Sequence, residues 1–115
     1  GRTGAPYISA YASTKHALVG LTRALAAELA DKGITVNALC PGYVDTPMTD
    51  QSVDRIVARA GVTAETAREK LVAANPQRRL ITAEEVAFFA VTLCDERARG
   101  VNGQTVGIDG GGFLG

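Results

Sequence analysis

The sequence predicts an α/β fold in which helices cover both faces of a parallel sheet. Residues 34–39 are almost wholly apolar and rich in β-branched side chains, which is typical of a strand buried on both faces. Segments with a helical repeat of apolar residues precede and follow this strand, and a second strand is predicted over residues 104–108. Because two strands are too few for an independent sheet, we expect them to belong to a larger one.

A long helix is predicted over residues 9–32, after a loop at residues 1–8. Gly33 is a natural stop for this helix. Its leucines recur at intervals of three and four, so they form one apolar stripe: Leu18, Leu21, Leu25 and Leu29. A second set of positions is small enough for close approach by another helix: Ala17, Gly20, Ala24 and Ala27. Packing against the chain's own sheet explains the small residues equally well.

Three shorter helices are predicted in the second half of the chain. Two of them, over residues 50–60 and 64–74, are separated by Gly61-Val-Thr63, and apolar residues repeat along each at helical spacing: Val53, Ile56, Val57 and Ala60, then Ala67 and Leu71. The third covers residues 83–95. It begins after Thr82-Ala-Glu-Glu85, which has the spacing of a capping box, and its apolar face is Val86, Phe89, Ala90 and Leu93.

Composition argues against several classes of partner. Twelve basic and twelve acidic residues balance, so nothing favours nucleic acid or an anionic membrane, and no apolar stretch is long enough to cross a bilayer. Cys40 and Cys94 are far apart and are predicted to be buried structural thiols. His16 is the single histidine and is expected on a helix surface. The sequence therefore predicts no metal site.

Tyr11 and Lys15 are the first candidates for chemistry. Residues four apart on a helix share one face, so both side chains can reach the same small volume. A phenol ionises near pH ~10, and a cation held beside it lowers the pKa toward the range in which acid–base catalysis works. For this spacing alone, the alternative is an ordinary Tyr and Lys on a helix surface.

The segment after the first strand is the second candidate. Pro41 lacks an amide proton and favours the end of the strand, and Gly42 has no Cβ to hinder a ligand. Ligands of open α/β sheets bind beyond the carboxyl ends of the strands. We therefore expect residues 41–46 to border a binding site.

Four motifs occur in one order along nearly the whole chain: Tyr-x-x-x-Lys, Val-Asn-Ala-Leu-Cys-Pro-Gly-x-Val-x-Thr, Thr-Ala-Glu-Glu-Val-Ala and Asn-Gly-Gln-x-x-x-x-Asp-Gly-Gly. Each is weak alone, but together they are highly specific. In this order they resemble the C-terminal half of the classical short-chain dehydrogenases/reductases. The resemblance implies that residues 1–115 are the C-terminal part of one doubly wound, Rossmann-type domain.

The same resemblance implies that the N-terminal, dinucleotide-binding half is absent. The family's catalytic Ser lies thirteen residues before the Tyr, which here falls outside the sequence. Its catalytic Asn and its glycine-rich turn lie further upstream. We therefore expect activity in a longer parent protein and none in the fragment alone.

The resemblance also implies roles for individual residues. Tyr11 would be the general acid in carbonyl reduction and the base in alcohol oxidation, with Lys15 lowering its pKa and binding the nicotinamide ribose. The Val44 backbone and the Thr46 hydroxyl match positions that hold the carboxamide, although Thr46 as a simple turn residue is the alternative. The cofactor-binding set is thus Tyr11, Lys15, Pro41, Gly42, Val44 and Thr46. The cofactor is NAD or NADP, because the residues that discriminate between them lie in the absent half.

For the substrate, the resemblance implies a small carbonyl compound or alcohol. Residues 50–75 resemble the substrate-binding lid of the family, with a surface hairpin that binds nothing as the alternative. The segment ending at residues 75–80 is similar to that of 3-hydroxybutyrate dehydrogenases and related 3-hydroxyacyl or polyketide ketoreductases. The 3-oxoacyl carrier-protein reductases are the main competitor. Arg78 and Arg79 are candidates to face a carboxylate or a thioester carrier, or else are solvated.

The resemblance further implies a cytoplasmic homo-oligomer, a dimer or tetramer, in which the long helix packs against its counterpart in a neighbouring subunit. Two other readings stay open. A non-catalytic relative would use the dinucleotide fold as a sensor or scaffold, although such a protein has no need for both Tyr11 and Lys15. A truncated product would fail to fold and would expose its apolar surfaces.

Overall fold

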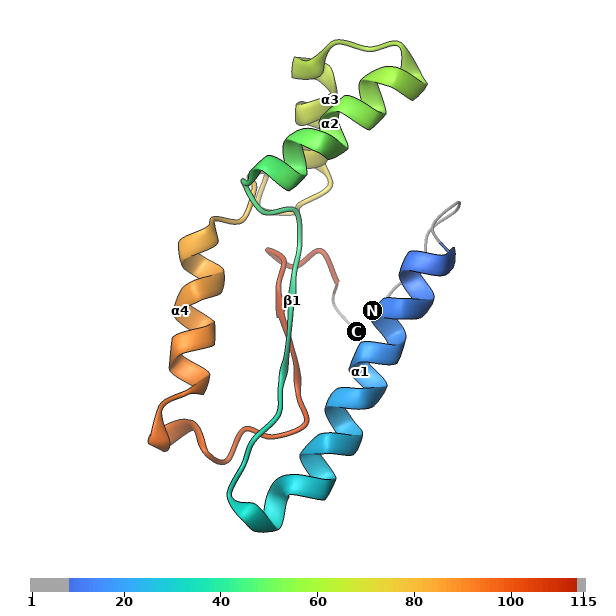
Figure 1. The fold of residues 1–115 in the computed structure, drawn as a ribbon. Helices are drawn as coiled ribbons and strands as arrows, with labels where there is room; N and C mark the ends of the chain where they lie inside the picture. Colours follow the sequence, from blue (N-terminus) through green and yellow to red (C-terminus); the bar gives the residue numbers. More distant parts are fainter. Residues whose placement is uncertain (1–8, 114–115) are drawn as a thin grey trace. The chain divides into compact units, whose positions relative to one another are not determined.

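The computed structural model describes residues 9–113 and confirms the α/β class (Figure 1). In chain order the elements are α1 (Ser9–Leu29), the short 3-10 helix η1 (Ala30–Lys32), β1 (Ala38–Pro41), α2 (Pro47–Ala60), α3 (Ala64–Ala73), α4 (Ala83–Leu93), the 3-10 helix η2 (Glu96–Ala98) and β2 (Thr105–Ile108). The loop expected at residues 1–8 lies outside the described residues.

The described chain divides into two compact units. The first comprises the residues up to Cys40 together with Ala90–Val106, and the second comprises Pro41–Phe89 together with the residues from Gly107 onward. The hydrogen bonds between β1 and β2 follow a parallel pattern, since the Ala38 amide donates to the Gln104 carbonyl and the Gly42 amide to the Ile108 carbonyl.

The first strand begins four residues later than the sequence predicts, at Ala38 instead of Ile34. Two side-chain amides take the place of the strand pairing just before it. Asn102 Oδ1 accepts from the Val36 amide and its Nδ2 donates to the Ala26 carbonyl. Asn37 Nδ2 donates to the Val101 carbonyl and its Oδ1 accepts from the Gln104 amide. An asparagine can donate and accept at once, so these two side chains satisfy the backbone without a regular ladder.

The buried face of α1 does not coincide with its leucine stripe. Val19, Thr22 and Ala26 are buried, whereas Leu18 and Leu21 of the leucine stripe are about half exposed, at 51% and 53%. The buried face lies against the loop before β2, where a Cβ on Gly103 would sit 3.3 Å from that of Ala26. The first two leucines of the stripe therefore have little cover within the described residues, whereas Leu25 and Leu29 are half-buried.

The α2–α3 hairpin carries the hydrophobic cluster of the second unit. Val53, Ala67 and Leu71 are buried, as their spacing predicts, and four partly buried residues pack around them: Ile56, Val57, Val62 and Leu80. Ala60, which was assigned to the same stripe, is exposed. Pro47 occupies the first turn of α2, where its missing amide proton costs nothing, and Gly61 ends the helix with a φ of 64°.

Helix α4 and the strands are less covered than the sequence suggests. No residue of α4 is buried, and Phe88 and Val91 are 67% and 73% exposed. Cys94 is exposed and Cys40 half-buried, so the prediction of a buried Cys94 is wrong for this chain. In β1 and β2 only Ile108 is buried, so the sheet is not covered on both faces by the described residues. Two strands give these faces too few neighbours to exclude water.

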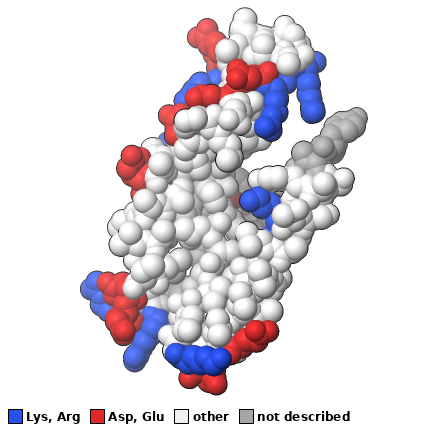
Figure 2. Space-filling view, in the orientation of Figure 1, with Lys and Arg blue, Asp and Glu red and all other residues white. Residues whose placement is uncertain are grey.

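Charges of both signs gather over the α2–α3 hairpin in the view of Figure 2, and neither sign dominates there. This arrangement agrees with the zero net charge of the sequence. None of the helices among residues 9–113 is long and apolar enough to span a membrane.

Candidate functional site

Tyr11 and Lys15 lie on the first turns of α1, in the first unit. The helix brings them together as the spacing predicts, with Lys15 Nζ 5.4 Å from the centre of the Tyr11 ring. Tyr11 is 62% exposed, and its hydroxyl has no hydrogen-bond partner among the residues that the structure describes. His16, on the same helix, is exposed and its Nδ1 lies 2.8 Å from the Ala12 carbonyl oxygen. A free phenol beside a cation is thus available to a bound molecule.

In the second unit, Pro41, Gly42, Val44 and Thr46 follow one another at the carboxyl end of β1. The strand ends at Pro41. Val44 then forms an isolated parallel bridge with Ile81, in which the Asp45 amide donates to the Ile81 carbonyl and the Ile81 amide to the Tyr43 carbonyl. In this bridge the N–H and C=O of Val44 itself point away from Ile81.

Two polar groups of this segment can still form hydrogen bonds. Within residues 9–113, the Val44 amide has no hydrogen-bond acceptor, whereas its carbonyl accepts from the hydroxyls of Thr46, at 3.4 Å, and Thr49. Thr46 is the residue that precedes α2, yet its hydroxyl accepts no bond from the first turn of that helix. The segment therefore presents one backbone donor and one hydroxyl that still has acceptor capacity.

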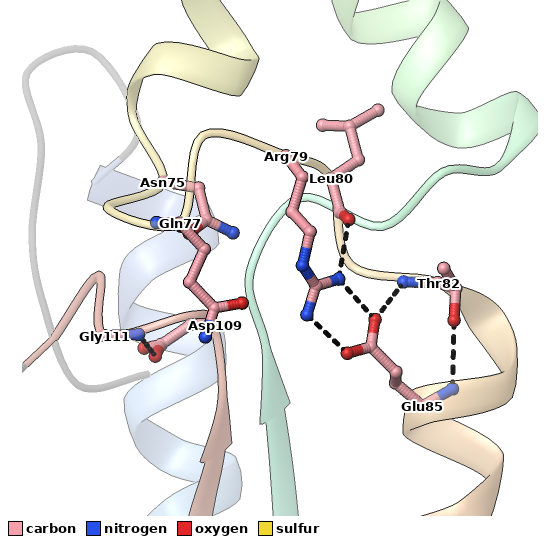
Figure 3. Close-up of polar contacts among 8 residues, drawn as sticks. All are labelled: Asn75, Gln77, Arg79, Leu80, Thr82, Glu85, Asp109 and Gly111. Carbon is pink, nitrogen blue, oxygen red and sulfur yellow. Dashed lines mark hydrogen bonds and ion pairs between the residues drawn. The ribbon is translucent and has the colours of Figure 1, made fainter.

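Close packing against Asp109 also favours glycine at position 42, which the sequence did not predict. A Cβ at this position would come within 3.2 Å of the Asp109 Cα and Cβ. Asp109 in turn accepts from the Gly111 amide (Figure 3), and a Cβ at Gly110 would lie 2.2 Å from Asn75 Oδ1. The glycine-rich end of β2 therefore lies against both residues 41–42 and the buried side chain of Asn75.

Arg79 faces a carboxylate, but one from its own chain. Its Nη1 and Nη2 donate to the two oxygens of Glu85, at 2.7 and 2.6 Å, and Nη1 also donates to the Leu80 carbonyl (Figure 3). Glu85 completes the predicted capping box, because it accepts from the Thr82 amide at 2.8 Å while Thr82 Oγ1 accepts from the Glu85 amide. In this structure Arg79 is therefore engaged by Glu85, and its contact with a substrate or carrier stays a prediction.

The neighbouring Arg78 is arranged differently. It adopts a φ of 56°, and its guanidinium has no partner among the described residues. It lines an open groove of about 440 Å³ with residues of α3: Glu65, Arg68, Glu69, Val72 and Ala73. Arg68 is occupied, since it bridges Asp45 and Asp50 at the start of α2. Arg78 is thus the one of the two predicted arginines that remains available here.

The Glu85 contacts predict an acid-dependent loss of stability. Hydrogen bonds from Arg79, and secondly from the Thr82 amide, lower the pKa of Glu85 from 4.5 to about 2. A carboxyl group whose pKa is lowered by folding stabilises the fold above its unfolded pKa, and this contribution is lost as the pH falls through the folded pKa. Denaturant unfolding of Glu85→Gln between pH 6 and pH 2 should therefore show a weaker pH dependence below about pH 4.5. Glu84→Gln, which removes an adjacent carboxylate that pairs with none of the described residues, is the control, and equal pH profiles for both variants would contradict the assignment.

Sequence reasoning missed the contact of Asn75 with Gly110 and the Arg79–Glu85 pair. The sequence contained a sign of the Arg79–Glu85 pair, because the capping box was recognised and Arg79 lies six residues before its glutamate. No signal short of the fold joins Asn75 to a glycine thirty-five residues away. No group of three His, Cys, Asp or Glu side chains within the described range could hold a metal ion.

The chain is similar in sequence to known oxidoreductases. A family model described as "Enoyl-(Acyl carrier protein) reductase" matches residues 1–112. An oxidoreductase of Bacillus subtilis named YxjF, itself uncharacterized, is 45% identical over 90% of the chain and 40% of its own length. A D-beta-hydroxybutyrate dehydrogenase of Rhizobium meliloti is 38% identical over 96% of the chain and 43% of its own length.

Among solved structures, a variant of actinorhodin polyketide ketoreductase with NADPH is similar at a TM-score of 0.90. It is 36% identical, and the match covers 96% of this chain and 42% of that one. The chain thus spans about two fifths of the length of the curated relatives it matches.

Proposed function

Because the chain belongs to the short-chain dehydrogenase/reductase family, we propose that it forms the C-terminal part of an NAD(P)-dependent oxidoreductase that interconverts a secondary alcohol and a ketone. The observation that supports this proposal most directly is the free Val44 amide beside the Thr46 hydroxyl, whose oxygen accepts no hydrogen bond from the described residues, directly beyond β1. A donor and an acceptor so placed suit the carboxamide of a nicotinamide, which itself both accepts and donates.

The bound nicotinamide would supply the hydride that adds to the carbonyl carbon. Tyr11 donates a proton to the carbonyl oxygen during reduction and removes it during oxidation. Lys15, whose Nζ lies 5.4 Å from the centre of the Tyr11 ring, is the proposed ligand of the ribose hydroxyls. Val44 and Thr46 hold the carboxamide, while Pro41 and Gly42 shape the approach to it.

The cofactor role of Thr46 leads to a direct prediction. Thr46→Val keeps the size of the side chain but removes its hydroxyl, so the affinity of the full-length protein for NADH or NADPH should fall about five- to tenfold, the cost of one hydrogen bond. Fluorescence titration of the reduced cofactors measures this. Ser52→Ala removes another hydroxyl, bonded within α2 to the Met48 carbonyl, and should leave the affinity unchanged. An affinity unaltered in Thr46→Val would make Thr46 a turn residue only.

For the substrate, we propose a 3-hydroxybutyrate or a 3-hydroxyacyl/3-oxoacyl compound. Arg78 supports an acidic group, because its guanidinium is free in the groove beside α3. The similarity to a D-beta-hydroxybutyrate dehydrogenase supports a free carboxylate, and the similarity to a polyketide ketoreductase supports a carrier-bound thioester. Comparing kcat/KM for 3-hydroxybutyrate with that for a 3-oxoacyl thioester decides between them, and failure of both would remove this substrate class.

A homo-oligomer, dimer or tetramer, in the cytoplasm is the proposed state of the intact protein. The half-exposed Leu18 and Leu21 of α1 support an association through that helix. A non-catalytic sensor of dinucleotides is the alternative from another class. It would bind NAD(P)H but would show no turnover with any alcohol or ketone.

A further inference from the structure

The Arg79–Glu85 clamp, defined as Arg79, Thr82 and Glu85, is an elaborate arrangement for a surface ion pair. One guanidinium contacts both oxygens of the carboxylate and the Leu80 carbonyl, while the same carboxylate binds the Thr82 amide (Figure 3). Two-pronged Arg–carboxylate pairs fix orientation as well as distance. The clamp therefore fixes the backbone of residues 79–82 against the first turn of α4.

The centre of that fixed segment is Ile81, which is 2% exposed. Its amide and carbonyl are both used by the segment that follows β1, at the Tyr43 carbonyl and the Asp45 amide, at 2.9 and 2.8 Å. These two bonds flank Val44 on the chain. The Val44 amide shares one trans peptide group with the Tyr43 carbonyl and points the opposite way, so the bond from Ile81 to that carbonyl sets the direction of the Val44 amide.

We propose that the clamp is a positioning device for the cofactor: it holds Ile81 in register with residues 43–45 and thereby directs the Val44 amide at the carboxamide. This inference rests on the proposed function. Neither Arg79 nor Glu85 needs to touch the cofactor, since both act through the backbone of Ile81. All of the residues concerned lie in one compact unit, so the route from the clamp to Val44 consists of contacts within that unit.

The test compares two ligands that share all but one part. NAD(P)H contains the nicotinamide, whereas ADP-ribose lacks it. If the enzyme prefers NADP, the 2′-phosphate form of ADP-ribose is used. In the full-length protein, Arg79→Ala should weaken NAD(P)H binding about fivefold, the effect of losing one well-formed ion pair, and leave ADP-ribose binding within error. Arg79→Lys keeps the charge but loses the two-pronged geometry, so it should weaken NAD(P)H binding in the same direction.

Two further variants separate positioning from general stability. Arg97→Ala removes a comparable exposed pair with Asp95, in which Nε and Nη2 donate at 2.8 Å, from the other unit. It should leave the affinity for both ligands unchanged. Glu85→Gln keeps an oxygen for the Thr82 amide but weakens the pair with Arg79, so it should reproduce the loss of NAD(P)H affinity without loss of the helix cap.

A readout without any cofactor completes the experiment. Hydrogen exchange of the peptide that contains residues 43–46 should be faster in ligand-free Arg79→Ala than in wild type, because the Asp45 amide bonds to Ile81. Equal weakening of both ligands, or an unchanged NAD(P)H affinity, overturns the inference while the proposed function stands. A wild-type protein that binds NAD(P)H no better than ADP-ribose overturns both.

Discussion

Tyr11→Phe in the full-length protein should lower kcat/KM by about a thousandfold or more, from the loss of a positioned proton donor and of the charge effects around it. The phenol lies beside Lys15 and its hydroxyl forms no hydrogen bond with the described residues, so losing that hydroxyl breaks no structural bond there. The substitution removes one oxygen and keeps the ring. Steady-state kinetics with the best substrate, in both directions, measures the loss.

The controls distinguish chemistry from folding and binding. Affinity for NAD(P)H should change by less than about threefold in Tyr11→Phe, because the ring and Lys15 remain in place. His16→Gln alters another proton-transferring side chain on the same helix and should keep near-normal turnover, since the partner of the His16 ring among the described residues is the Ala12 carbonyl of that helix. A Tyr11→Phe enzyme with near-normal kcat/KM would remove Tyr11 from the mechanism.

The second large effect is expected on stability. Gly110→Ala should lower the free energy of unfolding by about 3 kcal/mol, as the sum of left-handed backbone strain and overpacking. Gly110 has a φ of 64°, and its new Cβ would lie 2.2 Å from Asn75 Oδ1. Asn75 is buried, and its Oδ1 accepts from the Gln77 amide, so the side chain cannot withdraw without breaking that bond. Denaturant unfolding of the full-length protein measures the change.

Gly61→Ala is a matched control for this effect. Gly61 also has a φ of 64°, but nothing lies within 4 Å of the position of its Cβ, so only the strain of about 1 kcal/mol should appear. If the contact with Asn75 causes the remainder, combining Gly110→Ala with Asn75→Ala should cost less than the sum of the two single changes. Equal losses for Gly110→Ala and Gly61→Ala would show that the contact is unimportant.

Local patterns predicted much of the fold because their causes are local. The capping box at Thr82–Glu85 is a relation between residues three apart, and its two hydrogen bonds are present as expected. The cluster of Val53, Ala67 and Leu71 follows from helical spacing in two adjacent segments. The proximity of Lys15 to Tyr11 has the same origin. In each case the information lies within a few turns of the chain.

The predictions that failed depend on residues distant in sequence. Residues 34–37 have the composition of a strand, but the Val36 amide donates its hydrogen bond to the side chain of Asn102, more than sixty residues later. The leucine stripe of α1 was recognised as apolar, yet Val19, Thr22 and Ala26 are the residues that are covered. Periodicity shows that a face is apolar, but not which neighbour covers it.

At the candidate site, sequence identified the residues but not their surroundings. Motif spacing indicated Val44 and Thr46, whereas the bridge to Ile81 that orients their backbone depends on a contact with a segment thirty-seven residues further on. Arg79 was a candidate to face a carboxylate because of its charge. Its actual partner, Glu85, had already been assigned to the helix cap. One carboxylate serving two purposes is difficult to recognise from a linear pattern.

The α2–α3 hairpin has a consequence for how such proteins diversify. Its buried residues contact one another, and its ends are set by Pro47, Gly61 and the Thr63 cap, whose hydroxyl accepts from the Thr66 amide. Mutations on its outer positions therefore leave its internal packing intact. Such a segment can accumulate changes, or be exchanged whole between related genes, while the strands and the motifs on either side of it stay as they are.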